Sequence, residues 1–102
     1  MPASYDAILL RILADCQPIR AASGEAIPGE DRVWSHVFYA AARADLGEGA
    51  DSLICRAEAR RIIATVRVRD SHLYDRPGFD PYVVVRGPRA PKQLTLKLGG
   101  TT

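Results

Sequence analysis

Apolar residues at the start of the chain recur with the period of an α-helix. The stripe consists of Tyr5, Ile8, Leu9, Ile12, Leu13 and Cys16. Residues at this spacing share one face of a helix, so the pattern predicts an amphipathic helix whose apolar face is core. Ser4 or Ala3 is expected to open it. Proline does not fit a helix interior, and Pro18 therefore predicts that the helix ends near Cys16 or Gln17.

The next stretch is rich in turn residues and then becomes helical again. Residues 18–30 hold two Pro and two Gly, which predicts a loop with one short extended piece around Ala26–Ile27. A second helix is expected over residues 32–44. Its buried face would consist of Val33, Trp34, Val37, Phe38 and Ala41. Gly47 follows this helix at the position where a positive φ is common, so the connection to the next element is predicted to be very short.

A third helix is predicted to lead directly into a strand. Asp51 or Ser52 can cap the helix, because a short oxygen-bearing side chain accepts from the free N–H groups of the first turn. The core-facing residues at near-helical spacing are Leu53, Ile54, Ala57 and Ile62. Arg56 and Arg60 are four residues apart and share the opposite face. Over residues 64–69 apolar and polar positions alternate, and this period of two predicts a strand.

Two further segments predict a C-terminal β-hairpin. Tyr82–Arg86 is β-branched and bounded by Pro and Gly, and Gln93–Leu98 alternates strictly, with its three Leu residues on one face. The tip between them, residues 87–92, contains two prolines, which stop further ladder pairing. The basic residues at this tip are Arg86, Arg89 and Lys92.

Length and composition indicate a single domain. With 102 residues, 47% of them apolar, residues 1–102 are expected to form one globular α+β domain. No apolar run approaches the length of about eighteen residues that a membrane helix needs, and the N-terminus lacks the basic start of a secretory signal. We therefore expect a cytoplasmic protein without membrane contact, and its small size leaves a homodimer open. The residues expected to be buried together are Leu9, Ile12, Trp34, Phe38, Ile54 and Ile62.

Charge is distributed unevenly along the chain. The overall net charge is +2, but residues 1–51 carry four Arg against eight acidic residues, and residues 52–102 carry ten basic against four acidic residues. Such asymmetry between halves is typical of proteins that contact nucleic acid, and it is also what two mutually complementary halves of one fold would have. Arg supplies twelve of the fourteen basic residues, and its guanidinium suits bidentate recognition of phosphate or carboxylate.

The sequence contains no pattern that predicts an enzyme. The phosphate-binding, dinucleotide-binding, nucleophile-elbow and zinc-protease motifs are all absent, and we expect no cofactor and no metal. Cys16 and Cys55 fall on apolar helical faces and are expected to be buried reduced thiols. His72, Asp75 and Asp80 could form an acid–base or metal site in principle. In a polar loop with Gly and Pro, however, Asp residues are more typical turn formers.

The order helix, short extended piece, helix, tight turn, helix, hairpin resembles that of the winged helix-turn-helix superfamily. The resemblance covers nearly the whole chain and rests on element order. It implies a three-helix winged helix-turn-helix-like domain with a C-terminal β-hairpin. The third helix would enter the DNA major groove, and the hairpin, or wing, would contact the backbone or minor groove. The implied DNA-binding residues are Arg56, Arg60 and Arg61 on the third helix and Arg86, Arg89 and Lys92 on the wing.

Two functions from different classes follow as hypotheses. The first is a small DNA-binding protein of bacterial or phage origin, a transcriptional regulator that binds double-stranded DNA as a dimer. The alternative is a protein-binding inhibitor or adaptor on the same scaffold, for example a phage anti-defence or anti-CRISPR protein, whose acidic residues would dock on a basic groove. The alternative requires one exposed acidic face formed by Glu25, Glu30, Asp31, Asp45, Glu48 and Asp51. A continuous basic face formed by Arg56, Arg60, Arg89 and Lys92 would favour DNA.

Overall fold

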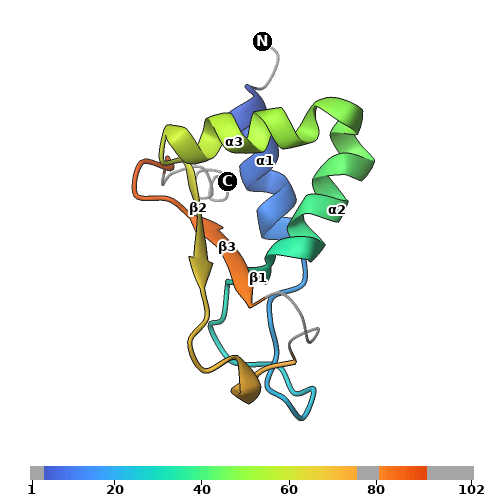
Figure 1. The fold of residues 1–102 in the computed structure, drawn as a ribbon, viewed down its shortest axis with the longest axis vertical. Helices are drawn as coiled ribbons and strands as arrows, with labels where there is room; N and C mark the ends of the chain where they lie inside the picture. Colours follow the sequence, from blue (N-terminus) through green and yellow to red (C-terminus); the bar gives the residue numbers. More distant parts are fainter. Residues whose placement is uncertain (1–3, 76–80, 92–102) are drawn as a thin grey trace, which may run out of the picture.

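The computed structural model describes residues 4–75 and 81–91, whose arrangement is shown in Figure 1. The α-helices are α1 (Tyr5–Asp15), α2 (Ser35–Leu46) and α3 (Ala50–Ala59). They pack on an antiparallel sheet of β1 (Val33–Trp34), β2 (Ile63–Arg67) and β3 (Tyr82–Arg86). Two short 3₁₀ helices, η1 (Gly47–Gly49) and η2 (Ser71–Leu73), complete the described elements. The α+β class that the sequence predicts is confirmed.

Helix α1 begins and ends where its sequence signals predict. The hydroxyl oxygen of Ser4 accepts a hydrogen bond from the N–H of Ala7 at 3.1 Å, which satisfies one of the free donors of the first turn. The residues that α1 buries are Leu9, Leu10, Ile12 and Leu13. Tyr5 is 57% exposed, so the apolar stripe is core at its centre and reaches solvent at its N-terminal end. The helix stops at Asp15, ahead of Pro18.

The start of the second helix differs from the sequence prediction. Val33 and Trp34 were expected in its first turn, but they form strand β1, and α2 begins only at Ser35. The extended piece therefore lies at residues 33–34 and not at Ala26–Ile27. The reason is tertiary: Val33 pairs with Val84 of β3, and a β-branched residue fits well on a half-buried pleated surface.

A very short turn joins α2 to α3. Gly47 has φ 73°, and its N–H donates to the carbonyl of Arg43, so it ends α2 in a conformation that glycine adopts without steric cost. Only the η1 residues 47–49 separate the two helices. A bidentate ion pair links the helices across this turn, because Arg43 donates from Nε and Nη2 to the two carboxylate oxygens of Asp51, each at 3.0 Å.

Strand β3 is the central strand of the described sheet. The strand order is β1-β3-β2, with Val84 paired to Val33 on one side and to Thr65 on the other. The hairpin is thus formed by β2 and β3, and the strand expected at Gln93–Leu98 lies outside the described residues. Consecutive antiparallel strands joined by one loop normally pair with each other, and β3, with a fully buried Val on each of its faces, is suited to a central position.

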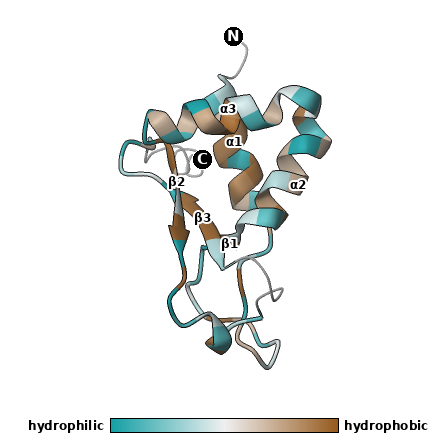
Figure 2. Ribbon diagram, in the orientation of Figure 1, coloured by the Kyte–Doolittle hydropathy of each residue, from teal (hydrophilic) through white to brown (hydrophobic). Residues whose placement is uncertain are grey.

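The buried side chains form two clusters. The larger one joins the helices to one face of the sheet and contains Leu9, Ile12, Phe38, Ile54 and Ile62, as expected. Trp34 is also buried, at 5% exposure, but it belongs to a smaller cluster with Ile19, Val68 and Val83. Neighbouring strand residues point to opposite faces of the sheet, so Val33 packs in the larger cluster and Trp34 in the smaller one. Figure 2 shows the hydrophobic residues concentrated along α1 and the strands.

Two loops are bonded to each other at the end of the sheet distant from α3, as seen in the lower part of Figure 1. The N–H of Ala22 donates to the carbonyl of Leu73 at 3.0 Å, and the N–H of Asp75 donates to the carbonyl of Arg20 at 2.9 Å. The Asp75 carboxylate in turn accepts from the N–H of Arg20 at 3.1 Å and from Nε1 of Trp34 at 2.9 Å. The β2–β3 connection is therefore anchored to the loop that precedes β1.

Candidate nucleic-acid interface

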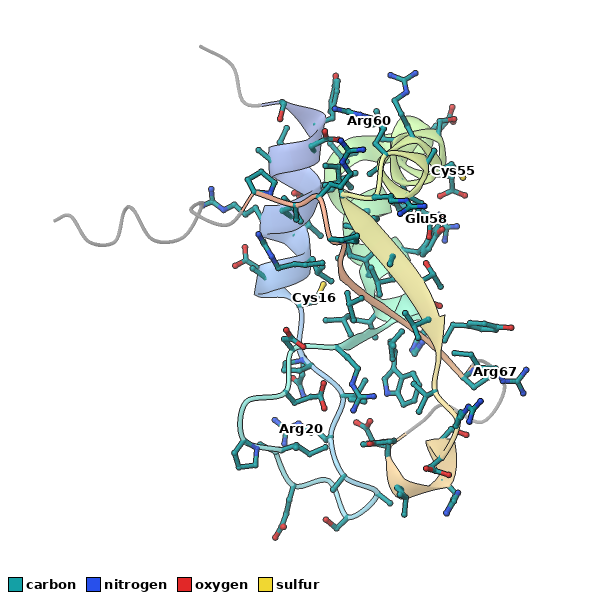
Figure 3. All side chains as sticks on the ribbon, turned by 90° about the vertical axis from the view of Figure 1, so that its left-hand side faces the viewer. Cys16, Arg20, Cys55, Glu58, Arg60 and Arg67 are labelled. Atoms are coloured by element: carbon teal, nitrogen blue, oxygen red, sulfur yellow. The ribbon has the colours of Figure 1, made fainter. Side chains whose placement is uncertain are left out.

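Helix α3 presents a mixed polar surface to solvent. Ala50, Ile54 and Ala57 are fully buried along its inner side. The exposed residues between its ends are Asp51, Ser52, Cys55, Arg56 and Ala59. Arg56 thus lies on the exposed side, where a ligand can reach it. Figure 3 shows Cys55 and Glu58 of α3 directed to the same side of the molecule as Arg67 of β2, away from α1.

The C-terminal end of α3 is a complete Schellman motif with an arginine at its left-handed position. The N–H of Ile62 donates to the carbonyl of Ala57 at 2.9 Å, and the N–H of Arg61 donates to the carbonyl of Glu58 at 3.0 Å. Arg61 has φ 64°, a conformation that glycine usually supplies at this position. Arg60, the preceding residue, pairs through Nη1 with the Asp6 carboxylate of α1 at 2.7 Å and keeps 58% of its side chain exposed.

A turn after β3 rests on the end of α3 and brings two further arginines there. The N–H of Gly87 donates to the carbonyl of Ile62 at 2.8 Å, and the N–H of Arg89 donates to the carbonyl of Arg61 at 3.0 Å. A side chain at residue 87 would place its Cβ 2.2 Å from the Arg61 carbonyl oxygen, so this close approach requires glycine. Arg86, exposed at the end of β3, donates to the carbonyl of Pro91.

Backbone contacts therefore bring four of the arginines expected to bind DNA to the C-terminal end of α3. Arg60 and Arg61 come from the end of α3, and Arg86 and Arg89 come from the turn after β3; all four are exposed. We call this set the arginine cluster. Arg56 lies one turn earlier on α3, and Lys92 lies outside the described residues. The carbonyl end of a helix carries a partial negative charge, which favours cations at this position.

Within residues 4–75 and 81–91, the arginine cluster lies away from the tip of the hairpin that β2 and β3 form. The tip of the described hairpin is the β2–β3 connection, at the opposite end of the sheet. Its first basic residues are Arg67 and Arg69, both exposed. The alternation of residues 64–69 predicted only a strand for these two arginines. The available signal was their position next to the polar stretch of residues 70–81, which is rich in turn-forming residues.

The acidic residues do not form one surface. Glu25, Glu30 and Asp31 lie in the loop before β1, while Asp45, Glu48 and Asp51 lie around the α2–α3 turn at the other end of the molecule (Figure 1). Hydrogen bonds from Arg32 lower the pKa of Glu30, and hydrogen bonds from Arg43 lower the pKa of Asp51. Each of these two carboxylates is thus bound within the chain.

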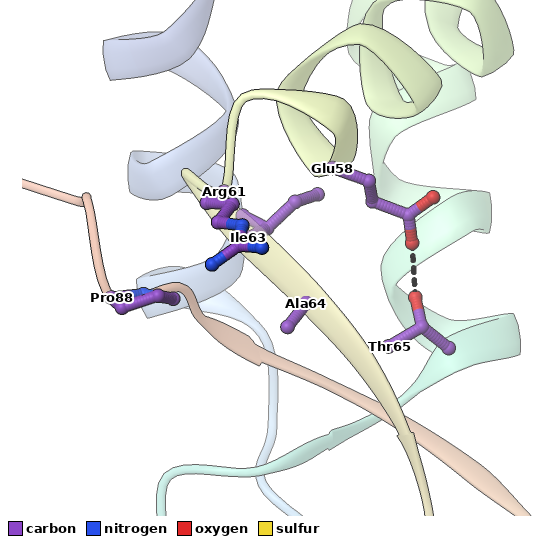
Figure 4. A pocket seen from close by; sticks show the side chains of 6 residues that line it. All are labelled: Glu58, Arg61, Ile63, Ala64, Thr65 and Pro88. Carbon is purple, nitrogen blue, oxygen red and sulfur yellow. Dashed lines mark hydrogen bonds between the residues drawn. The ribbon is translucent and has the colours of Figure 1, made fainter.

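An open groove of about 520 Å³ runs beside the start of β2 (Figure 4). Its lining residues are Glu58, Arg61, Ile63, Ala64, Thr65 and Pro88. The hydroxyl of Thr65 donates to the Glu58 carboxylate, which fixes this acidic group above the strand. The groove thus places one anion and one cation, Arg61, along an exposed strand.

The two cysteines differ in environment. Cys16 is half-buried, and burial, with a smaller effect of Asp15, raises the pKa of its thiol. Cys55 is exposed, so the expectation that both thiols are buried is wrong for this residue. It follows Ile54, which takes the buried position, and the next buried residue is Ala57. Within residues 4–75 and 81–91, no three His, Cys, Asp or Glu side chains come together in a way that could hold a metal ion.

Comparison with known protein families, with curated proteins and with solved structures found no match to this chain. Across the described parts of the chain, no helix has the length and apolar character needed to cross a bilayer.

Proposed function

We propose that this chain is a winged helix-turn-helix-like DNA-binding protein that acts as a transcriptional regulator of bacterial or phage origin. The element order α1-β1-α2-α3-β2-β3 and the short glycine turn between α2 and α3 support the resemblance to that superfamily. The observation that carries the proposal is that backbone contacts bring four exposed arginines, Arg60, Arg61, Arg86 and Arg89, to the C-terminal end of α3. Arginine guanidinium groups bind phosphate bidentately, and phosphate contacts supply most of the non-specific affinity for DNA.

Within this proposal the basic residues divide into two roles. Arg56, on the exposed side of α3, contacts base edges or the adjacent phosphates, as expected for a helix that enters the major groove. The arginine cluster grips the backbone, with Lys92 as a further candidate that follows the same turn. Arg67 and Arg69, where β2 leads into the β2–β3 connection, are further candidates for the wing contact.

The backbone strain at Arg61 supports a role for its side chain. A non-glycine residue with positive φ costs on the order of 1–2 kcal/mol, and such residues are over-represented at functional sites. Glycine would end α3 with the same hydrogen bonds and without that cost. An arginine at this position is consistent with selection for its charge.

A salt titration with random-sequence duplex DNA tests the proposal. We expect binding that weakens steeply as salt increases, with a slope of log affinity against log salt of roughly −4 if the cluster occupies four phosphates. Arg89→Gln is expected to reduce that slope by about one unit for every sequence.

Arg11→Gln is the matched control for Arg89→Gln. Arg11 is an exposed arginine on α1 that lines a groove with Asp15 and Asp45. Its replacement removes the same charge from the chain and is expected to leave the slope unchanged. Equal effects of both variants, or no binding of duplex DNA by the parent chain at low salt, would remove the basis for this function.

The acidic-surface alternative receives less support. Its requirement was one exposed face formed by six acidic residues. Those residues are divided between the two ends of the molecule, and two of them are paired with arginines of the same chain. We therefore do not develop it as a second function.

A further inference from the structure

Strand β2 has one edge that no described strand covers. It is the last strand in the order β1-β3-β2. The carbonyl of Ile62 and the N–H of Val68 both bond to the β3 side, through Gly87 and Pro81. Backbone groups alternate in direction along a strand, so even-numbered residues face β3. The N–H and C=O groups of Ile63, Thr65 and Arg67 consequently face the open edge.

This edge has few of the features that usually prevent strands from pairing. Protected edges carry prolines, bulges or several charges. β2 has five residues with a regular register to β3 along its whole length, and it contains no proline. Its side chains include a single charge, Arg67, and Val66 is 46% exposed. An exposed valine on an open edge gains from being covered by another apolar surface.

We propose that a second copy of this chain pairs with the open edge, β2 against β2, in an antiparallel arrangement with Thr65 on the two-fold axis. In this register each outward-facing residue meets another outward-facing residue. Thr65 lies opposite Thr65 of the second copy, and Ile63 lies opposite Arg67 of the second copy. All six outward backbone groups on each strand can then form hydrogen bonds, and the two sheets become one six-stranded sheet.

The side chains on both faces of the strand are complementary in this register. On one face Val66 lies opposite the half-buried Ala64 of the second copy, so two apolar pairs form across the axis. On the other face Arg67 extends over Ile63 of the second copy toward the groove that holds Glu58 (Figure 4). Because the arrangement is two-fold symmetric, the Arg67–Glu58 contact forms twice, once from each copy.

The dimer is expected to be weak. Two five-residue strands bury less than the roughly 1,200 Å² at which stable interfaces begin, so association depends on concentration. Arg61 also lines the groove and opposes the incoming Arg67. Arg61 and Arg67 also belong to the proposed DNA contact, so the pairing is tested without DNA.

Mass measurement by light scattering over a concentration series tests the pairing with two variants of one residue. Thr65→Pro and Thr65→Val both remove the hydroxyl that donates to Glu58, but only Thr65→Pro removes the outward N–H. Proline is tolerated where the N–H of an edge strand faces away from its neighbour. We expect the parent chain and Thr65→Val to approach twice the monomer mass at high concentration and Thr65→Pro to stay monomeric. A parent chain that is monomeric throughout, or equal association of both variants, overturns the proposal.

Disulfide trapping gives a second readout that does not depend on the proline variant folding. In a chain carrying Cys16→Ser and Cys55→Ser, Thr65→Cys would place two thiols across the axis, where opposed Cα atoms are about 5.5 Å apart, within disulfide range. Arg67→Cys is the matched control, because residues 67 of the two copies would be roughly 13 Å apart. We expect Thr65→Cys to form a cross-linked dimer at least ten times faster than Arg67→Cys. Equal rates would show that the edges do not pair in this register.

Discussion

Arg61 occupies a backbone conformation that its side chain makes unfavourable. Its φ of 64° completes the hydrogen bonds that end α3, and glycine would form the same bonds with less steric conflict. Fold stability and affinity for DNA therefore favour different residues at this position. The stability of the fold favours glycine, whereas the proposed phosphate contact favours a cation.

We expect Arg61→Gly to raise the free energy of unfolding by about 0.5–1 kcal/mol, because relief of the left-handed strain exceeds the added freedom of the unfolded chain. The same variant is expected to bind duplex DNA more weakly. Urea unfolding and DNA titration measure the two effects. Arg61→Lys, which keeps the charge and the strain, is the control for both; a glycine variant less stable than the lysine variant would contradict the assigned strain.

Arg56 is the α3 arginine that stands clear of the cluster, on the exposed side of the helix. We expect Arg56→Ala to cost about 1–3 kcal/mol in DNA affinity and to reduce discrimination between sequences, because a helix residue can reach base edges. Affinity for a selected site and for random duplex DNA measures this. A loss that is the same for every sequence would assign Arg56 to the backbone and not to the bases.

Trp34 links the small cluster to the anchored loops. It is buried, and its Nε1 donates to Asp75 at 2.9 Å. We expect Trp34→Ala to lower the free energy of unfolding by about 3–5 kcal/mol, the usual cost of deleting a large buried ring. Urea unfolding followed by circular dichroism measures it. A loss below about 1 kcal/mol would mean that the small cluster contributes little to the fold.

At the scale of elements, local periodicity predicted those features that depend on the sequence of one segment alone. The stripe of α1 and the cap at Ser4 were sufficient for that helix, and the alternation of residues 64–69 was sufficient for β2. The partner of each strand could not be predicted, because alternation shows which face is buried and not which neighbour pairs. This is why Val33 and Trp34 were expected in a helix and why the pairing of β3 with β1 and β2 was not predicted.

The residues of the candidate site could be predicted from the sequence, but the contacts that bring them together could not. The resemblance in element order to the winged helix-turn-helix superfamily, supported by the charge asymmetry, selected Arg56, Arg60, Arg61, Arg86 and Arg89 as candidates. Their meeting point depends on Gly87, whose close approach to the Arg61 carbonyl is a tertiary contact. No short-range pattern around Gly87 specifies it. The left-handed conformation of Arg61 could not be predicted either, because glycine is the sequence signal for this conformation at a helix end and it is absent here.

Gly87 and Gly49 form a matched pair for testing this construction. We expect Gly87→Ala to destabilise the fold by about 1–3 kcal/mol, because its Cβ would meet backbone atoms that must move. At Gly49 an added Cβ meets nothing within 4 Å, and φ is −81°, so Gly49→Ala is expected to be neutral or slightly stabilising. Thermal unfolding of both variants measures this, and equal midpoints would show that the turn after β3 can shift without cost.

At the scale of the whole molecule, acid stability should depend on the loop before β1. Arg32 donates to both carboxylate oxygens of Glu30 at 2.8 Å and to the hydroxyl of Tyr74 at 3.2 Å, so it joins this loop to the β2–β3 connection. The hydrogen bonds from Arg32 lower the pKa of Glu30 in the folded chain. This contribution to stability is therefore present above the unfolded pKa of about 4.3 and is lost as the pH falls through the lower folded value.

We expect Glu30→Gln to remove part of the stability near neutral pH and to flatten the decline below about pH 4. Urea unfolding at a series of pH values measures this, with Glu25→Gln, an exposed residue of the same loop, as the control. A parallel decline in the parent chain and the Glu30 variant would assign the acid sensitivity to other carboxylates.

The anchored β2–β3 connection has a consequence for how DNA would be recognised. Residues 73–75 are bonded to residues 20–22, so this described part of the connection is fixed to the loop that precedes β1. Little conformational entropy remains to be lost there when a duplex binds. Any adjustment of shape must then come from the DNA, which bends or changes groove width at an energy that depends on its sequence. A stiff protein surface would thereby discriminate between duplexes by their flexibility, including at base pairs that no side chain touches.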